Sequence, residues 1–264
     1  MLSYHQGPRN FLLDLGTGHG LVPRQIAASF PKILGTDPSK NMIAQAQKTS
    51  SNEGYKHLSF QVAAAEDDLG LEAGSVDMIT SGQAAHWFDY PRLFPQLGRV
   101  VRKGGTLAFW GYKDHVFVDY PIASEILADY AYANDKHKLG PYWPKGREIL
   151  QNKLRAVKPP ESDWENIQRI EYEPGTQGRQ SGQGTFFFSR RLTVGECMGY
   201  VRTWSSYHEW ATIYKDSVAR NEGGKGDVVD QMFDEMAEHH PEMADWEKEI
   251  EIEWGSGLIL ARRK

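Results

Sequence analysis

The first 111 residues alternate short apolar runs with longer segments of helical periodicity. The apolar runs have the length of single strands and are bounded by glycine or polar residues, which is typical of strands in a buried sheet. They lie at 11–15, 33–35, 58–62, 76–80 and 106–111. Strand and helix alternate at intervals of about 20 to 25 residues, which predicts parallel strands joined by right-handed crossovers.

After Tyr112 this alternation ends, and the chain becomes rich in aromatic residues and proline. Further helical and strand-like stretches follow at 167–172, 193–214, 227–239, 249–254 and 258–261. The pattern predicts an α/β fold with a doubly wound, mostly parallel, seven-stranded Rossmann-like sheet and a helical cap inserted among the C-terminal strands. We expect a single domain over residues 1–264. Its core is assigned to 1–112, 147–190 and 249–264, and its cap insertions to 113–146 and 191–248.

The first strand runs into a turn with glycine at every second position, from Gly16 to Gly20. Glycine lets a ligand approach the main chain closely, and the carboxylate of Asp37, after the next strand, can accept both hydroxyls of a ribose. A dinucleotide fingerprint would place another glycine at position 21, where this chain has Leu21. Asp14 adds a carboxylate that would repel a pyrophosphate. The pattern therefore favours a cofactor with a ribose and a positively charged amino-acid tail.

Composition narrows the function classes. A net charge of −5 and a pI near 6.0 argue against nucleic acid or an anionic membrane as the main partner. The single cysteine, Cys197, excludes an internal disulfide framework and fits a reducing compartment. No apolar stretch has the length of a membrane span and no histidine, cysteine and carboxylate set has metal-site spacing. We expect a soluble, cytoplasmic protein without a metal, and the sequence leaves the oligomeric state open.

The segment from Asp14 to Gly20 resembles motif I of the class I methyltransferases. Narrower motifs at 86–89, 140–143 and 200–207 resemble the fungal trans-aconitate 3-methyltransferase family, and the resemblance runs over nearly the whole chain. It implies a Rossmann-like methyltransferase fold that binds S-adenosyl-L-methionine. It also implies O-methylation of a carboxylate on a small polycarboxylic acid such as trans-aconitate. Members usually carry a cofactor-covering segment further upstream than this sequence begins. Two expectations stay open: either this sequence is a shortened form of the chain, or the site is more open than usual.

The resemblance also assigns site residues. The cofactor-binding set is Asp14, Gly16, Thr17, Gly18, Gly20, Asp37, Pro38, Met42, Ala65, Glu66 and Gln83. The catalytic set is His86, Trp87 and Tyr207. The substrate-binding set is Trp110, Tyr142, Trp143, Arg191, Arg202 and Trp204.

Several of these residues have a structural interpretation as well. Trp87 and Trp110 could be core residues, His86 could cap a turn, and Arg202 could belong to an ion pair. As a binding residue, Arg202 would hold a carboxylate that is not methylated, with Arg191 behind it.

Three alternatives to a carboxyl methyltransferase stay open. A fungal secondary-metabolite methyltransferase acting on a phenol, enol or amine would need a general base, for which His86 is the candidate. A catalytically weak methyltransferase fold could serve only for binding. A nicotinamide dehydrogenase is disfavoured by Leu21.

Overall fold

The computed structural model describes residues 1–264 and divides them into two compact units, each made of separate stretches of chain. The first unit holds Met1–Tyr112, Glu148–Ile170 and Ser256–Lys264, and the second holds Lys113–Arg147 and Glu171–Gly255. The core expected from the sequence differs from the first unit chiefly by including 171–190 and 249–255, which cluster with the second.

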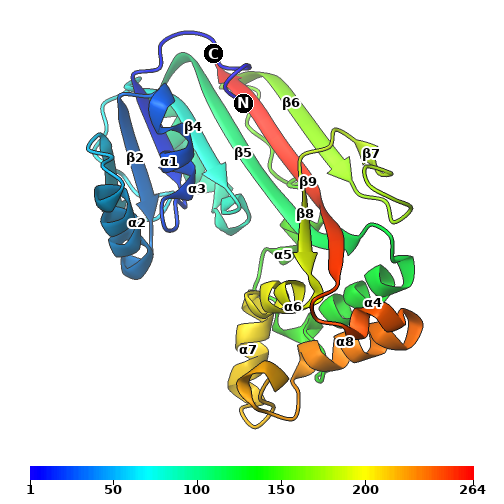
Figure 1. Ribbon diagram of the computed structural model, residues 1–264. Helices are drawn as coiled ribbons and strands as arrows, with labels where there is room; N and C mark the ends of the chain where they lie inside the picture. Colours follow the sequence, from blue (N-terminus) through cyan, green and yellow to red (C-terminus); the bar gives the residue numbers. More distant parts are fainter. The chain divides into compact units, whose positions relative to one another are not determined.

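The first unit contains the alternating strands and helices that the apolar pattern predicts (Figure 1). Its elements are β1 (Phe11–Leu15), α1 (Leu21–Ile26), β2 (Lys32–Asp37), α2 (Lys40–Asn52), β3 (Leu58–Val62), β4 (Val76–Gly82), α3 (Tyr90–Val100) and most of α5 (Arg147–Gln151). β1 pairs in parallel with β2 and β4, β2 pairs with β3, and β4 pairs with β5 (Val101–Phe117). These pairings confirm the predicted parallel, doubly wound arrangement.

All five residues of β1 are buried because the strand faces apolar clusters on both sides. Leu12 belongs to one cluster, together with Ile33, whereas Leu13 and Leu15 belong to the other, together with Ile79. Successive side chains of a strand point to opposite faces, so this division follows from the strand's period of two. The buried β1 is therefore a fixed support for the glycine turn that follows it.

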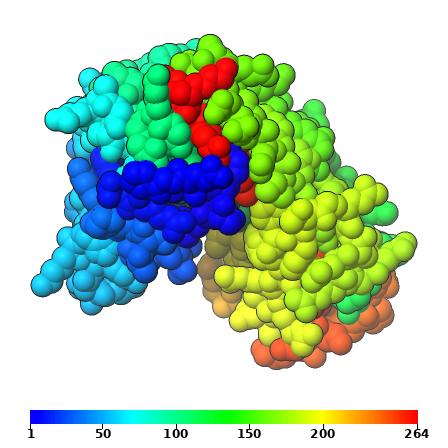
Figure 2. Space-filling model, turned by 90° about the horizontal axis from the view of Figure 1, so that it is seen from above, coloured from blue at the N-terminus to red at the C-terminus, as the bar shows by residue number.

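The N-terminal residues complete the first of these clusters. Met1, Leu2 and Tyr4 pack against it, as does Leu258 from the C-terminal strand, and Leu260 is one of its buried members. Figure 2 shows this N-terminal segment, in dark blue, on the surface near the red C-terminal strand.

The second unit is mainly helical. Its helices are α4 (Pro121–Tyr132), α6 (Val194–Arg202), α7 (Ser205–Ile213) and α8 (Val228–His239), and its short strands are β7 (Gln183–Gly184) and β8 (Ser189–Thr193). It also includes parts of β5, of β6 (Trp164–Glu173) and of β9 (Glu249–Arg263). The helical run predicted over 193–214 is divided in two, because the chain leaves the helical conformation between Arg202 and Ser205. No helix of the chain is both long enough and apolar enough to cross a membrane.

The sheet has nine strands rather than the predicted seven. Their order is β3-β2-β1-β4-β5-β9-β6-β7, and β8 pairs with β9 in antiparallel orientation. β7 and β8 were not predicted. β7 lies in a polar, glycine-rich stretch and is only two residues long, and β8 has the sequence SRRLT, so neither has the apolar alternation that marks a strand.

Candidate cofactor site

A cavity of about 730 Å³ lies at the carboxyl ends of β1, β2 and β4. Every lining residue belongs to the first unit and falls within 16–22, 37–42, 64–66 or 82–88. The carboxyl edge of a parallel sheet is where an α/β fold collects its ligand-binding loops. Of the eleven residues assigned to the cofactor from sequence, the cavity wall contains all except Asp14 and Gly20.

The glycine turn needs glycine for two different reasons. Gly16, Gly18 and Gly20 all have positive φ angles, of 64°, 55° and 81°. A β-carbon on Gly16 would stand 2.3 Å from the β-carbon of Ala84, so glycine there permits close packing between two loops. A β-carbon on Gly18 would have no atom within 4 Å. At Gly18 the main chain itself therefore faces open space in the cavity.

Asp37 is held in place by two main-chain donors. The amide N–H of Gly18 donates to Oδ2 of Asp37 at 2.9 Å, and the amide N–H of Ser39 donates to Oδ1 at 2.9 Å. The first bond joins the glycine turn to the end of β2. These two bonds fix the orientation of the Asp37 carboxylate. Each of its oxygens can still accept a further hydrogen bond from a ligand.

Asp14 lies beneath the turn and not on the cavity wall, which differs from the direct contact expected from the sequence. Its Oδ1 accepts a 2.6 Å hydrogen bond from the Thr80 hydroxyl, whereas Oδ2 is buried and has no partner in the protein. Burial raises the pKa of Asp14 to about 7. The bond from Thr80 opposes this rise and the nearby charge of Asp37 adds to it. Asp14 is thus a buried carboxyl group that can gain or lose a proton near neutral pH.

The loop after β3 presents few free polar groups. The Ala64 amide donates to Asp67 at 2.8 Å, and Glu66 accepts a 2.6 Å bond from the Asp89 amide at the start of α3. Glu66 therefore fixes this loop to a neighbouring helix with one of its two oxygens.

The mouth of the cavity is strongly apolar. Leu21, Met42 and Trp87 all line it, with exposed fractions of 50%, 42% and 55%. Large apolar side chains exposed together in this way mark a surface that a ligand covers. In the sequence, Leu21 served only as evidence against a dinucleotide. Because Leu21 directly follows the glycine turn, its position could also have indicated that it lines the site.

The loop after β4 supplies the opposite wall, through Gly82, Gln83, Ala84, Trp87 and Phe88. Ala84 and Phe88 were missed by the sequence analysis. Their signal is their position after the end of β4, at the ligand-binding edge.

Two aromatic residues predicted for the site lie off the cavity wall. The His86 ring lies 4.6 Å from that of Trp87, centroid to centroid, and is not part of the lining. Trp110 is also outside the lining. It packs beneath Gly82, where a β-carbon would stand 2.7 Å from the Trp110 ring. Of the two interpretations that the sequence left open for Trp110, the structure supports packing.

Comparison with known proteins gives the family. The profile described as a methyltransferase domain matches residues 13–109. The chain is 31% identical to the probable S-adenosylmethionine-dependent methyltransferase CRG1 of Saccharomyces cerevisiae, with 100% of this chain and 89% of CRG1 covered. The chain belongs to the S-adenosylmethionine-dependent methyltransferases.

Two further similarities accompany this assignment. A solved structure described as a type II methyltransferase of Anaeromyxobacter dehalogenans has the same fold, with a TM-score of 0.69, 22% identity, and 99% and 93% of the two chains covered. A malonyl-[acyl-carrier protein] O-methyltransferase of Legionella pneumophila is 30% identical over 49% of this chain and 46% of its own length.

The cavity of this methyltransferase fits S-adenosyl-L-methionine. Asp37 would accept hydrogen bonds from ribose hydroxyls, and Leu21, Pro38 and Met42 would offer apolar surface to the base. The lining contains no lysine or arginine, and its carboxylates suit a cationic ligand. Gly18 leaves main chain open to the ligand. When bound, the cofactor supplies an activated methyl group on a positively charged sulfur.

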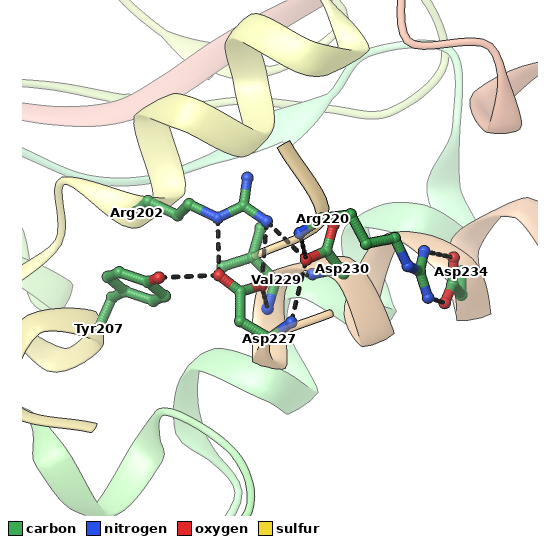
Figure 3. Close-up of polar contacts among 7 residues, drawn as sticks. All are labelled: Arg202, Tyr207, Arg220, Asp227, Val229, Asp230 and Asp234. Carbon is green, nitrogen blue, oxygen red and sulfur yellow. Dashed lines mark hydrogen bonds and ion pairs between the residues drawn. The ribbon is translucent and has the colours of Figure 1, made fainter. Parts of the chain in front are cut away.

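For Arg202, the structure favours the ion-pair interpretation over the predicted substrate role (Figure 3). Its Nε and one terminal nitrogen donate to the two carboxylate oxygens of Asp227 at 2.7 and 2.9 Å, and it also pairs with Asp230 at 3.0 Å. Burial alone would raise the pKa of Asp227, but the bonds from Arg202, Asp230 and Tyr207 hold it below its usual value. A guanidinium that binds two buried carboxylates through two of its three nitrogens fits a structural role, which was the alternative interpretation for this residue.

Tyr207, which was predicted to be catalytic, belongs to the same cluster and is not part of the cavity lining. Its hydroxyl donates to Oδ2 of Asp227 at 2.8 Å, and burial together with Asp227 raises the pKa of Tyr207 to about 12. Figure 3 shows Arg202 and Tyr207 directed at the same carboxylate.

The remaining predicted substrate residues also lie in the second unit. The Trp143 indole donates to the carbonyl of Ala131, and the Tyr142 hydroxyl donates to that of Lys136. Trp204 is buried. Arg191 differs, because its ion pair with Glu249 is long at 3.7 Å and both side chains are about two-thirds exposed.

Proposed function

We propose that this methyltransferase transfers a methyl group to a carboxylate oxygen of a small polycarboxylic acid such as trans-aconitate. The observation that carries the proposal is the apolar cavity wall, with Trp87 exposed at its mouth. Two other findings support it: the motif resemblance, and the similarity to a relative named for O-methylation of a malonyl group, which ends in a carboxyl group.

The chemistry suits such a wall. A carboxylic acid has a pKa near 4, so the nucleophile arrives ionised at neutral pH and needs no general base. Its negative charge and the positive charge of a sulfonium diminish together as the new bond forms. A site that excludes water therefore favours the transition state over the separated, hydrated ions.

We assign the chain's own residues the following roles. Asp37 binds the ribose hydroxyls, and Glu66 keeps the loop of Ala64 and Ala65 against the base. Trp87 excludes water from the reacting groups, and His86 supports the Trp87 ring. Arg191 is the candidate cation for a carboxylate that is not methylated, since its ion pair is loose.

The decisive experiment is a transfer assay with tritiated S-adenosyl-L-methionine over a panel of di- and tricarboxylic acids and matched phenols and amines. A carboxyl methyltransferase gives a product from which mild alkali releases tritiated methanol, because the bond formed is an ester. Label that resists alkali identifies an ether or an amine and contradicts the proposal.

The pH profile provides an independent check. A carboxylate substrate should react without loss of rate as the pH falls from 8 to 6. A phenol activated by His86 as general base should lose activity as the pH falls, since protonation removes the base. Asp37→Ala is the negative control.

A further inference from the structure

Gln83, in the wall of the cavity, has a backbone conformation that is unusual for its residue type. Its φ angle is 61°, in the left-handed region that residues with a β-carbon rarely adopt. Such a conformation persists only when surrounding contacts enforce it, and these positions cluster at functional sites. The contacts that enforce it here are hydrogen bonds to β5.

The Gln83 side chain continues the sheet beyond its last regular pair. β4 and β5 are in register up to Gly82 and Trp110. The Gln83 amide N–H then donates to the Trp110 carbonyl at 2.9 Å. Its side-chain Nε2 donates to the Tyr112 carbonyl at 2.8 Å, and its Oε1 accepts from the Tyr112 amide at 2.8 Å. The carboxamide therefore satisfies both the main-chain N–H and the main-chain carbonyl of Tyr112, as the backbone of a neighbouring strand would.

Neighbouring glycines leave room for this arrangement. A β-carbon on Gly111 would stand 3.2 Å from Oε1 of Gln83, and a β-carbon on Gly82 would press on the Trp110 ring. On the other side of Gln83, Ala84 packs against Gly16 so closely that no β-carbon fits there. The loop after β4 is thus held between β5 and the glycine turn.

We propose that Gln83 is a positioning residue for the cofactor, acting through a carboxamide clamp on Tyr112 and not through a contact of its own side chain with the cofactor. The clamp fixes Ala84 against Gly16, and so sets the separation of the two loops, both of which line the cavity. This inference rests on the cofactor occupying that cavity, and it does not depend on which substrate is methylated.

The test compares Gln83→Glu with Gln83→Met, two substitutions that nearly preserve the length of the side chain. In Gln83→Glu, the introduced carboxylate can accept from the Tyr112 amide when it is ionised, but it repels the Tyr112 carbonyl. When the same group is protonated, it regains a donor and can restore both bonds. Placed against a carbonyl and partly buried, this carboxyl should have a pKa far enough above the usual value of about 4.3 to be mostly protonated at pH 5. In Gln83→Met, the thioether can replace neither bond at any pH.

The measurement is the dissociation constant of S-adenosylhomocysteine by calorimetry between pH 5 and pH 8, taken as a ratio to wild type at each pH. This ratio removes the contribution of Asp14, His19, Asp37 and Glu66, the ionisable groups on or beneath the cavity wall, which all three proteins share. We expect Gln83→Met to bind about tenfold more weakly throughout, the worth of roughly one to two hydrogen bonds. We expect Gln83→Glu to match that loss at pH 8 and to recover to within about twofold of wild type at pH 5.

Two results would overturn the clamp: wild-type affinity for Gln83→Met, or a Gln83→Glu ratio that does not change with pH. The pH series of Gln83→Glu is its own folding control, because one protein is compared with itself. A wild-type protein that binds no cofactor would instead refute the cofactor site itself. A wild type that binds cofactor but methylates no carboxylate would refute only the substrate.

Discussion

At the scale of single residues, Asp37 joins the glycine turn to β2 and faces the cavity. We expect Asp37→Ala to weaken S-adenosyl-L-methionine binding about 100-fold, since two hydrogen bonds to a charged acceptor are lost at about 1.5 kcal/mol each or more. Calorimetry measures this directly. Asp68→Ala is the matched control, because Asp68 is an exposed carboxylate of the same unit, paired with Arg99 outside the cavity. An equal loss in both variants would contradict the ribose assignment.

Asp14 should make stability depend on pH. The folded protein holds the Asp14 proton up to a pKa of about 7, whereas the unfolded chain releases it near 3.8. The folded state therefore binds more protons between these values, and its stability falls as the pH rises from about 4 to about 7. The difference between the folded and unfolded pKa values of Asp14 corresponds to a decrease of roughly 4 kcal/mol in the unfolding free energy.

Asp14→Asn isolates this effect. Asparagine keeps an acceptor for the Thr80 hydroxyl but cannot ionise, so the variant should equal wild type near pH 4.5 and exceed it in stability at pH 8. Urea unfolding of cofactor-free protein at both pH values provides the measurement. Parallel pH profiles for the two proteins would show that Asp14 does not retain its proton in the folded state.

At the scale of elements, the start of α8 depends on Asp227. This residue caps the helix by accepting from the Val229 and Asp230 amides at 2.9 Å, and the same carboxylate binds Arg202 at the end of α6. One buried carboxylate thus joins two helices of the second unit. The energetic consequence is that removing Arg202 leaves a buried charge without its partner.

We therefore expect Arg202→Ala to lower the unfolding free energy by about 3 to 5 kcal/mol, with no selective rise in the KM for a polycarboxylate. Arg220→Ala is the control, since Arg220 pairs with Asp234 near the surface and its loss should cost less than about 1 kcal/mol. Urea unfolding and steady-state kinetics supply the two readouts. A raised KM without lost stability would restore the substrate role.

The elements also show what the sequence could and could not predict. The strands and helices of the first unit were predicted because their signals are local, within five to thirteen residues. β9 was predicted as two pieces because Gly255 and Gly257 look like a break. In the structure the strand is continuous, and a β-carbon on Gly257 would collide with the Lys153 carbonyl. These glycines permit close packing, and close packing with a distant residue leaves no local signal.

At the scale of the whole molecule, the same reasoning explains the uneven prediction of the site. Most residues predicted for the cofactor line one cavity, because the glycine turn and Asp37 lie within one crossover, where spacing alone carries information. The substrate residues were chosen by chemical type, and type could not show that Arg202 is paired with a carboxylate 25 residues away. The aromatic motifs of the second unit largely pack with one another, as His115 does with Tyr200, Trp204 and Trp254.

The division into two units leads to a last prediction, about which unit a bound ligand stabilises against unfolding. Every residue of the cavity wall belongs to the first unit, so a ligand in the cavity should stabilise that unit directly. At a free concentration 100 times its dissociation constant, S-adenosylhomocysteine should raise the unfolding free energy of the first unit by about 2.7 kcal/mol, because this unit must unfold to release it. Hydrogen exchange should then slow about 100-fold for slowly exchanging amides of β1, β2 and β4, and change little in α4, α6 and α8. Equal protection in both units would show instead that they unfold as one cooperative body. Asp37→Ala should abolish the protection at the same ligand concentration, which ties the effect to the cavity.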